Sequence, residues 1–369
     1  MAETPARRPT GSDLPRSVHV VGSKTLGGAE RFFLRLLDAL HERGAPVVAC
    51  LRKGSDVVAE MPPGIAVIET PMRTVWDPWS RHRLARAITT ARPDIVQTYM
   101  GRATRLTRLP IGGGVVHVAR LGGYYKLDGY RHAHAWIGNT QGICDYLVRN
   151  GMPADRVFHI GNFIDPPVLV EPGAPAALRA AHGIPADAIT LVTAGRFVPV
   201  KGLQYLLHAF ADLPAGVGGR PLWLVMVGDG PLRDELQQLA ARLGVAGRVS
   251  WTGWQTRPGP YFTMADLVVF PSLSAEALGN VILEAWTYGK PLVTASFHGA
   301  VEITRHGEDA WRVPCGDAPA LAGGIRTLLD DPPLAAALAA AGSRRARDEF
   351  SRAAVVEKYL DLYRTLRVH

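Results

Sequence analysis

Short runs of β-branched and apolar residues alternate along the chain with longer segments whose apolar residues recur at helical spacing. Strands are expected at residues 17–22, 46–51, 65–69, 94–98, 115–120, 135–138, 189–194, 222–227, 249–252, 267–270 and 291–295. Helices are expected at residues 29–43, 80–91, 140–150, 203–211, 232–243, 279–288, 318–329, 334–349 and 352–366. Strands that alternate with helices favour parallel sheets covered on both faces.

The alternation is interrupted once, between residues 165 and 185, where Pro-Pro and Glu-Pro-Gly precede an Ala-rich helical patch. A length of 369 residues also predicts about two domains. We therefore expect a disordered, Pro-rich leader at 1–15, a first domain at 16–164 and a second at 165–351. The pattern of the final helix leaves open which domain it packs against.

Composition narrows the class of protein. With 47% hydrophobic and 20% charged residues, the chain can bury a sizeable core, which excludes wholesale disorder and a fibre. The cysteines Cys50, Cys144 and Cys315 are too few and too far apart for a disulfide framework or a metal site. Without an apolar run of membrane-spanning length or a signal peptide, the sequence predicts a soluble protein of the reducing cytoplasm.

The net charge of +8 is unevenly distributed. Residues 1–164 carry 22 Lys+Arg against 13 Asp+Glu, whereas residues 165–369 carry 19 against 20. A basic half-molecule suggests a nucleic acid, an anionic membrane or a phosphorylated substrate as partner, although solubility alone is the simpler explanation. No familiar nucleic-acid-binding motif, P-loop, nucleophile elbow or zinc motif accompanies the charge.

Two acids, Glu276 and Glu284, follow the expected strand at 267–270, one in a polar loop and one in the helix that Gly279 opens. Open parallel sheets bind ligands beyond the carboxyl ends of their strands, so both carboxylates can face one cleft and accept hydrogen bonds from sugar hydroxyls. The alternative is an exposed loop acid and a helix acid favoured by the dipole.

Cationic residues and glycines combine after the strand at 189–194, in the sequence Gly195-Arg196 to Lys201-Gly202. Helix N-terminal amides and fixed positive charge together favour a diphosphate. A loop with two solvated cations is the alternative.

Two further glycine turns follow strands. Gly228 and Gly230 let the backbone approach a ligand, but suit a tight strand-to-helix connection equally well. Gly27 and Gly28 open the first helix without the G-x-G-x-x-G order, which argues against an NAD site. Four aromatic residues lie in segments of the first domain where loops over a cleft are expected: Tyr124, Tyr125, Trp76 and Trp79. They are candidates for stacking on an acceptor sugar or for ordinary packing.

In this order, the motifs resemble those of the retaining glycosyltransferases of family 4, including bacterial members that build surface glycans. The resemblance covers nearly the whole chain, from 27–30 through 161–165, 195–202 and 228–231 to the E-x7-E pair. It implies the GT-B fold, an α/β architecture of two Rossmann-like, doubly wound parallel-sheet domains facing a deep cleft. The final helix would cross back, so that 16–164 plus 352–369 form the acceptor-side domain and 165–351 the nucleotide-sugar domain.

The resemblance also implies roles for single residues. Arg196 and Lys201 would hold the donor diphosphate and stabilise it as it leaves, a role that replaces a metal ion. Arg196, Lys201 and Glu276 would be the catalytic residues, with Glu276 in contact with hydroxyls of the transferred sugar. Glu284 would contact the ribose of the donor nucleotide. The implied donor-binding set is Gly27, Gly28, Gly195, Gly228, Gly230, Ala277, Leu278, Gly279 and Glu284.

One position departs from the family pattern. Many relatives place a histidine after the strand at 115–119, where this chain has Arg120, and His117 lies within the strand. In those relatives the histidine touches the donor sugar, and Arg120 is the best candidate to replace it. The acceptor-side candidates are Arg120, Tyr124 and Tyr125.

We expect a retaining glycosyltransferase that uses no cofactor or metal and moves a sugar from a nucleotide sugar to a glycan or lipid-linked acceptor, in lipopolysaccharide or surface polysaccharide biosynthesis. It would be cytoplasmic or peripheral on the inner face of the membrane, and would bind no nucleic acid. The alternatives are a sugar-nucleotide epimerase or hydrolase of the same fold, and a non-catalytic nucleotide-sugar-binding protein.

Overall fold

The computed structural model describes residues 14–167, 171 and 173–367. The chain divides into two compact units: unit 1 is Met1–Phe163 with Arg352–His369, and unit 2 is Ile164–Ser351. The division falls one residue from the boundary expected from the sequence. The predicted leader lies outside the described residues as far as residue 13. Leu14, however, is 7% exposed and packs in the core of unit 1, so the leader does not extend to residue 15.

Unit 1 is built on a seven-stranded sheet of order β3-β2-β1-β4-β5-β6-β7. Its strands are β1 (Ser17–Val21), β2 (Val47–Arg52), β3 (Ala66–Thr70), β4 (Ile95–Tyr99), β5 (Val116–Leu121), β6 (Ala135–Gly138) and β7 (Val157–His159). Every pairing is parallel. The chain extends the sheet outward from β1 on one side and then from β4 on the other, so the strand order reverses between β1 and β4.

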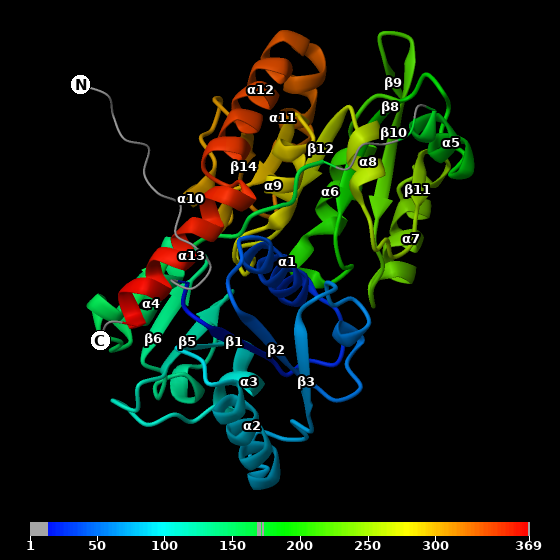
Figure 1. Ribbon diagram of the computed structural model, residues 1–369. Helices are drawn as coiled ribbons and strands as arrows, with labels where there is room; N and C mark the ends of the chain where they lie inside the picture. The colour runs from blue at the N-terminus through cyan, green and yellow to red at the C-terminus, as the bar shows by residue number, and fades with distance from the viewer. Residues whose placement is uncertain (1–13, 168–170, 172, 368–369) are drawn as a thin grey trace, which may run out of the picture. The chain divides into compact units, whose positions relative to one another are not determined.

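Helices cover both faces of this sheet because the strands bury side chains in both directions. They are α1 (Gly28–Glu42), α2 (Pro78–Ala91), α3 (Met100–Leu106), α4 (Gln141–Arg149) and α13 (Arg352–Arg367). One core lies under α1 and α13, and a second under α2 and α3. The last helix, α13, red in Figure 1, contacts α1 and β4 and therefore belongs to unit 1, the domain that the resemblance assigned to it.

Unit 2 repeats the design with the sheet order β11-β10-β8-β12-β13-β14, and a short antiparallel strand, β9, pairs with β10. The strands are β8 (Ile189–Ala194), β9 (Gly216–Val217), β10 (Arg220–Val227), β11 (Val249–Trp251), β12 (Leu267–Phe270), β13 (Leu292–Ala295) and β14 (Trp311–Val313). The order reverses between β8 and β12. Such a reversal opens a crevice at the carboxyl edge of a parallel sheet.

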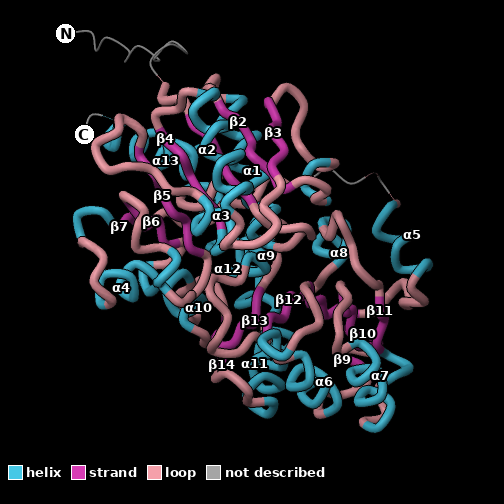
Figure 2. Tube along the Cα trace, turned by 90° about the horizontal axis from the view of Figure 1, so that it is seen from below, coloured by secondary structure: helices cyan, strands magenta, loops and turns pink. Residues whose placement is uncertain are grey.

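The helices of unit 2 are α5 (Ala174–Ala181), α6 (Leu203–Ala211), α7 (Arg233–Arg242), α8 (Gly259–Met264), α9 (Asn280–Thr287), α10 (His298–Ile303), α11 (Ala318–Asp330) and α12 (Pro332–Asp348). Side chains of α6, α7 and α11 fill the core on one face of the sheet, and those of α8, α9 and α10 fill the core on the other. Figure 2 shows α6, α7 and α11 together below the strands of this unit.

The two parallel-sheet domains predicted from the sequence are therefore confirmed, and most predicted elements end within two residues of those observed. The predictions coincide with the structure at β6, β8, β12 and α6. The missed elements, α3, α8, α10, β7, β9 and β14, contain two to seven residues each. Segments this short show too few repeats for periodicity to be read.

Candidate functional site

Three of the motifs found in the sequence follow three adjacent strands of unit 2. The segments that begin at Gly195, Gly228 and Pro271 leave the carboxyl ends of β8, β10 and β12, which are neighbours in the sheet. Two of these strands, β8 and β12, border the reversal of strand order. Topology therefore brings the cationic loop and the acidic loop to the edge where parallel sheets bind ligands.

The cationic and acidic loops meet in an ion pair. The Nζ of Lys201 lies 2.5 Å from Oε2 of Glu276, and Ser272 Oγ donates to the same oxygen at 3.2 Å. Lys201 Nζ also lies 5.0 Å from the centre of the Phe270 ring, within cation–π range. The two side chains are 19% and 15% exposed, so the pair is accessible to a ligand yet partly shielded from water.

Arg196, the second predicted cation, lies on the exposed loop after β8. Its neighbour Phe197 is 1% exposed and anchors that loop, since its backbone N–H donates to the carbonyl of Asp229 at 2.8 Å. Among the described residues, the Arg196 guanidinium forms no ion pair within 4 Å. Its backbone thus holds it at the edge of the site, and none of the acids in the described ranges compensates its charge.

The glycines of these loops have a packing role. Gly195 and Gly228 have φ of +146° and +141°, and a Cβ at Gly228 would collide with the carbonyl oxygen of Gly195. Gly230, with φ +159°, would place its Cβ against the backbone of Phe197. The loops after β8 and β10 therefore pack backbone to backbone, which supports the tight-connection interpretation of these glycines. The same compactness brings their backbone to the edge of the candidate site.

The acidic loop ends at the N-terminus of α9. Gly279 caps this helix with φ +74°, and a Cβ there would clash with the rings of Phe270 and Phe297. Leu278 is buried and Ala277 half-buried, so the loop between Glu276 and Gly279 is fixed by packing. Glu284 lies on the fifth position of α9 and is half-buried.

In unit 1, Gly27 and Gly28 stand at the start of α1 as the sequence suggested. The N–H of Gly27 donates to Oε2 of Glu30 at 2.9 Å, and Glu30 is only 5% exposed. The acid thereby caps its own helix, a contact that also favours the positive end of the helix dipole.

The acceptor-side candidates differ from one another in burial. Arg120 lies within β5 and is 4% exposed. Tyr124 and Tyr125 are 42% and 36% exposed, and their rings contact those of Tyr146 and Tyr130. The two tyrosines are thus held by neighbouring rings and still present surface to solvent.

Several polar residues at these sites were not assigned a role from the sequence. They are Ser272 beside Glu276, and Asn139, Asn162 and Tyr359 around Arg120. Asn162 lies in the stretch 161–165, which is one of the segments that carry the resemblance to the family. Tyr359 lies 239 residues from Arg120, and no local pattern could connect the two.

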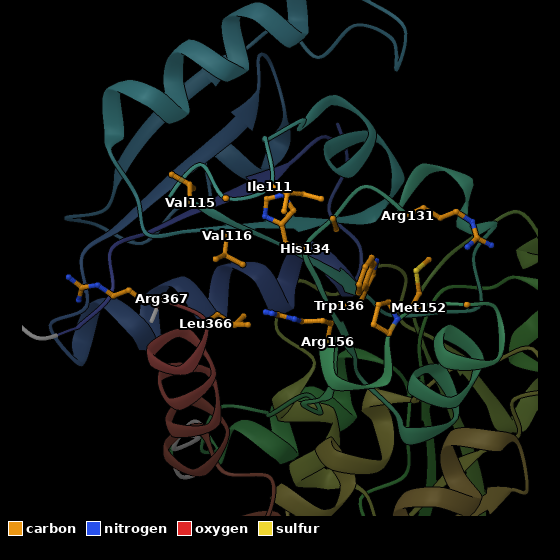
Figure 3. A pocket seen from close by; sticks show the side chains of 15 residues that line it. Ile111, Val115, Val116, Arg131, His134, Trp136, Met152, Arg156, Leu366 and Arg367 are labelled. Carbon is orange, nitrogen blue, oxygen red and sulfur yellow. The ribbon is translucent and has the colours of Figure 1, made fainter. Parts of the chain in front are cut away.

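A separate pocket of about 430 Å³ lies within unit 1 (Figure 3). Val116, Trp136 and Leu366 line it, together with the cationic side chains of Arg131 and Arg156. It lies at the amino ends of β5 to β7, at the opposite edge of the sheet from the carboxyl ends. None of the predicted site residues lines it.

Within the described part of the chain, no group of three or more His, Cys, Asp or Glu residues is arranged to hold a metal ion. In the same residues, no helix is both long enough and apolar enough to cross a bilayer.

Comparisons with known proteins agree with this organisation. The family model "Glycosyltransferase Family 4" matches residues 26–167, and "Glycosyl transferases group 1" matches residues 176–345. The lipopolysaccharide core biosynthesis glycosyltransferase LpsD of Rhizobium meliloti (strain 1021) is 37% identical over 92% of this chain and 95% of its own. LpsE of the same strain, described in the same words, is 36% identical over 91% of this chain and 95% of its own.

A solved structure, Anabaena Alr3699/HepE in complex with UDP and glucose, covers 95% of this chain and 100% of its own with a TM-score of 0.82. Its 22% sequence identity supports a common fold.

Proposed function

The chain belongs to the family 4 glycosyltransferases, which have the GT-B fold, and we propose that it transfers a sugar from a nucleotide sugar to the growing core of a lipopolysaccharide. The observation that carries the proposal is the Lys201–Glu276 pair at the strand-order reversal of unit 2. Near full-length similarity to two relatives named lipopolysaccharide core glycosyltransferases supports the acceptor class.

In the proposed reaction, Lys201 and Arg196 bind the diphosphate of the donor and stabilise its charge as the glycosidic bond breaks. Lys201 is held by Glu276 near the sheet edge, so it supplies this stabilisation from a preorganised position, and Arg196 adds a second positive charge. Because these side chains supply the positive charge, the proposal requires no metal ion. A solved neighbour contains UDP and glucose, which supports a nucleotide-sugar donor.

Glu276 and Glu284 accept hydrogen bonds from hydroxyl groups of the donor in this proposal. Glu276 is held by Lys201 and Ser272, so its second carboxylate oxygen can accept from a hydroxyl of the transferred sugar. Glu284, on α9, would accept from the ribose. We propose transfer with retention of anomeric configuration through an oxocarbenium-like state, with the leaving phosphate assisting deprotonation of the acceptor.

Unit 1 is the proposed acceptor side, and its charge supports an anionic partner. The charge difference between the two units is larger than the difference between residues 1–164 and 165–369, because α13 belongs to unit 1. Unit 1 then carries 26 Lys+Arg against 15 Asp+Glu, and unit 2 carries 15 against 18. We propose that the enzyme works at the inner face of the membrane, where a basic unit would meet anionic lipid and an anionic lipid-linked acceptor.

The relatives that match nearly the whole chain are named glycosyltransferases, which favours this class over an epimerase, a hydrolase or a non-catalytic binder. The distinction is measurable. A hydrolase or epimerase would convert the nucleotide sugar without any glycan acceptor, and a binding protein would give no product at all.

The test begins with a thermal-shift screen of nucleotide sugars, because a ligand that binds only the native state raises the apparent melting temperature. The stabilising donor is then incubated with truncated lipopolysaccharide core oligosaccharide, and NMR of the product gives the anomeric configuration. Transfer with retention supports the proposal. Donor turnover at the same rate with and without the oligosaccharide contradicts it.

A further inference from the structure

Arg120 is a buried cation whose partners among the described residues are all neutral. Its Nε donates to the hydroxyl of Tyr359 at 2.8 Å, and its Nη2 donates to Oδ1 of Asn162 at 2.5 Å. The guanidinium carbon lies 3.9 Å from the centre of the Phe32 ring. No acid of the described residues forms an ion pair with it. A buried charge is costly unless an opposite charge accompanies it, so this arrangement is suited to an anion that comes from outside the protein.

The remaining nitrogen of Arg120 lies near Gly122, whose missing side chain leaves room for a methyl group. A Cβ added to Gly122 would lie 4.0 Å from Nη1 of Arg120 and 3.6 Å from Nδ2 of Asn139. β5 and β6 place these residues together, since Leu121 pairs with Gly138 in the parallel register. An arginine nitrogen and an amide nitrogen therefore converge on a space that the missing side chain leaves open.

Asn139 supplies an independent sign of an absent ligand. It is 5% exposed, and its Oδ1 is buried with no hydrogen-bond partner among the described residues. Buried amide oxygens are nearly always paired, and an unpaired one needs an explanation. A bound sugar hydroxyl would satisfy it.

Glu30 is an acid of the same region, but it does not neutralise Arg120. The charges of Arg120 and Glu30 both act on Tyr125, whose pKa is raised chiefly by burial, lowered by Arg120 and raised by Glu30. Glu30, however, accepts from the N–H of Gly27 at the start of α1 and forms no ion pair with Arg120. The guanidinium remains available to a ligand.

We propose that Arg120 and Asn139, on either side of Gly122, bind an anionic substituent of the acceptor sugar, a carboxylate or a phosphate, together with a neighbouring hydroxyl. The guanidinium and the Asn139 amide N–H donate to the anion, and Asn139 Oδ1 accepts from the hydroxyl. This inference rests on the proposed function and names the substrate class of its acceptor side. Tyr359 and Asn162 are positioning residues, because each holds one guanidinium nitrogen.

Gly122→Ala tests the proposal most specifically, since it leaves Arg120 and its contacts with Tyr359 and Asn162 unchanged. Gly122 is not among the residues with positive φ, and a methyl group would meet its neighbours at ordinary van der Waals distance. The variant should fold normally and fill the proposed subsite. Gly247→Ala is the matched control, because a Cβ there meets nothing within 4 Å.

Binding is measured by ligand-observed NMR titration with three probes: methyl glucuronide, methyl glucoside 6-phosphate and neutral methyl glucoside. The wild-type protein should bind at least one anionic probe about 10-fold more tightly than the neutral one, as expected for a charge-assisted hydrogen bond. Gly122→Ala and Arg120→Gln should lose that preference, and Gly247→Ala should keep it. Preference for the glucuronide indicates a carboxylated acceptor, and preference for the phosphate a phosphorylated one.

Equal binding of all three probes, or an unchanged preference in Gly122→Ala, would overturn the proposed subsite. The nucleotide-sugar thermal shift separates this failure from failure of the proposed function. If Gly122→Ala retains the wild-type shift and loses only the anion preference, the acceptor subsite is supported independently. If no nucleotide sugar shifts the wild-type protein, the function fails whatever the probes show.

Discussion

Lys201 and Glu276 form an ion pair across two loops, with Nζ 2.5 Å from Oε2, although 75 residues separate them in the chain. The contact exists because β8 and β12 are neighbours and both loops leave the same edge of the sheet. Each residue satisfies the charge of the other. A bound diphosphate adds a second anion near Lys201, so we expect donor binding to redistribute the contacts of this pair.

Removing either charge should impair transfer. Lys201→Ala and Glu276→Gln are each expected to lower kcat/KM about 100-fold or more, the range seen when a preorganised electrostatic contact to the transition state is lost. Initial rates of sugar transfer measure this. Lys53→Ala and Glu235→Ala, both at exposed positions, are the controls. Full transfer in both site variants would refute the assigned roles.

The double variant Lys201→Ala/Glu276→Gln separates catalysis from structure. If the pair serves only folding, removing both partners should recover most of the stability and activity lost in either single variant, because no buried charge is left unpaired. We expect stability to recover and activity to stay low. Urea unfolding and transfer rates of all four proteins complete the cycle.

Gly228→Ala should destabilise unit 2. The residue has φ +141°, and its added Cβ would collide with the carbonyl oxygen of Gly195, so strain and steric conflict combine. A loss of about 2–4 kcal/mol in the free energy of unfolding is expected. Gly323→Ala, within α11 and with no atom near its Cβ, should instead gain about 0.5–1 kcal/mol. Equal effects of the two variants would argue against the described loop packing.

Stability should fall as the solution is acidified below about pH 6.5. Burial lowers the pKa of His19 to about 3, and burial together with His132 and His134 lowers that of His117 well below its usual value. Both histidines therefore stay neutral in the folded protein at pH values at which the same histidines of the unfolded chain take up protons. Their contribution to the free energy of unfolding is fully present above about pH 6.5. It declines below that pH, by up to about 1.4 kcal/mol per pH unit for each histidine.

Urea unfolding at several pH values between 7.5 and 5.5 measures this dependence. His19→Gln should lower stability at pH 7.5, because the imidazole bonds Ser17 and Tyr99, and should flatten the pH dependence. His208→Gln, at an exposed position, should leave the slope unchanged. A wild-type slope that persists in His19→Gln and His117→Gln would show that other groups are responsible.

Membrane association should depend on anionic lipid and weaken with salt. Arg83 and Arg86 are exposed on α2, near Trp79, which is 54% exposed. Arg83→Glu/Arg86→Glu should reduce co-sedimentation with phosphatidylglycerol vesicles, because each cation near an anionic surface contributes about 1 kcal/mol. Arg326→Glu, exposed on α11 of the near-neutral unit 2, is the control. Equal binding to neutral vesicles would contradict an electrostatic mechanism.

Local periodicity was sufficient to predict most strands and helices, since the β-branched runs and amphipathic faces bury the sides that their spacing indicates. It also placed the loops that hold Arg196, Lys201 and Glu276 after strands. The subsite around Arg120 escaped prediction, because Tyr359 approaches it from α13 and Asn139 from the end of β6. Arg120 lies inside β5, where hydrogen bonds to Tyr359 and Asn162 and the face of Phe32 make its burial tolerable, and no local pattern predicted these contacts.

The sequence by itself determined the class of fold, two successive parallel-sheet units, and the order of the motifs, because these depend on the spacing of apolar residues and on short segments. It left open which loops meet, since that depends on strand order rather than on chain order. Only the tertiary structure paired Lys201 with Glu276 and assigned α13 to unit 1, which concentrated the positive charge there. Only the tertiary structure, too, placed a buried guanidinium and the amide nitrogen of Asn139 beside Gly122, and left the Asn139 amide oxygen without a partner among the described residues, because these contacts arise where neighbouring strands end side by side.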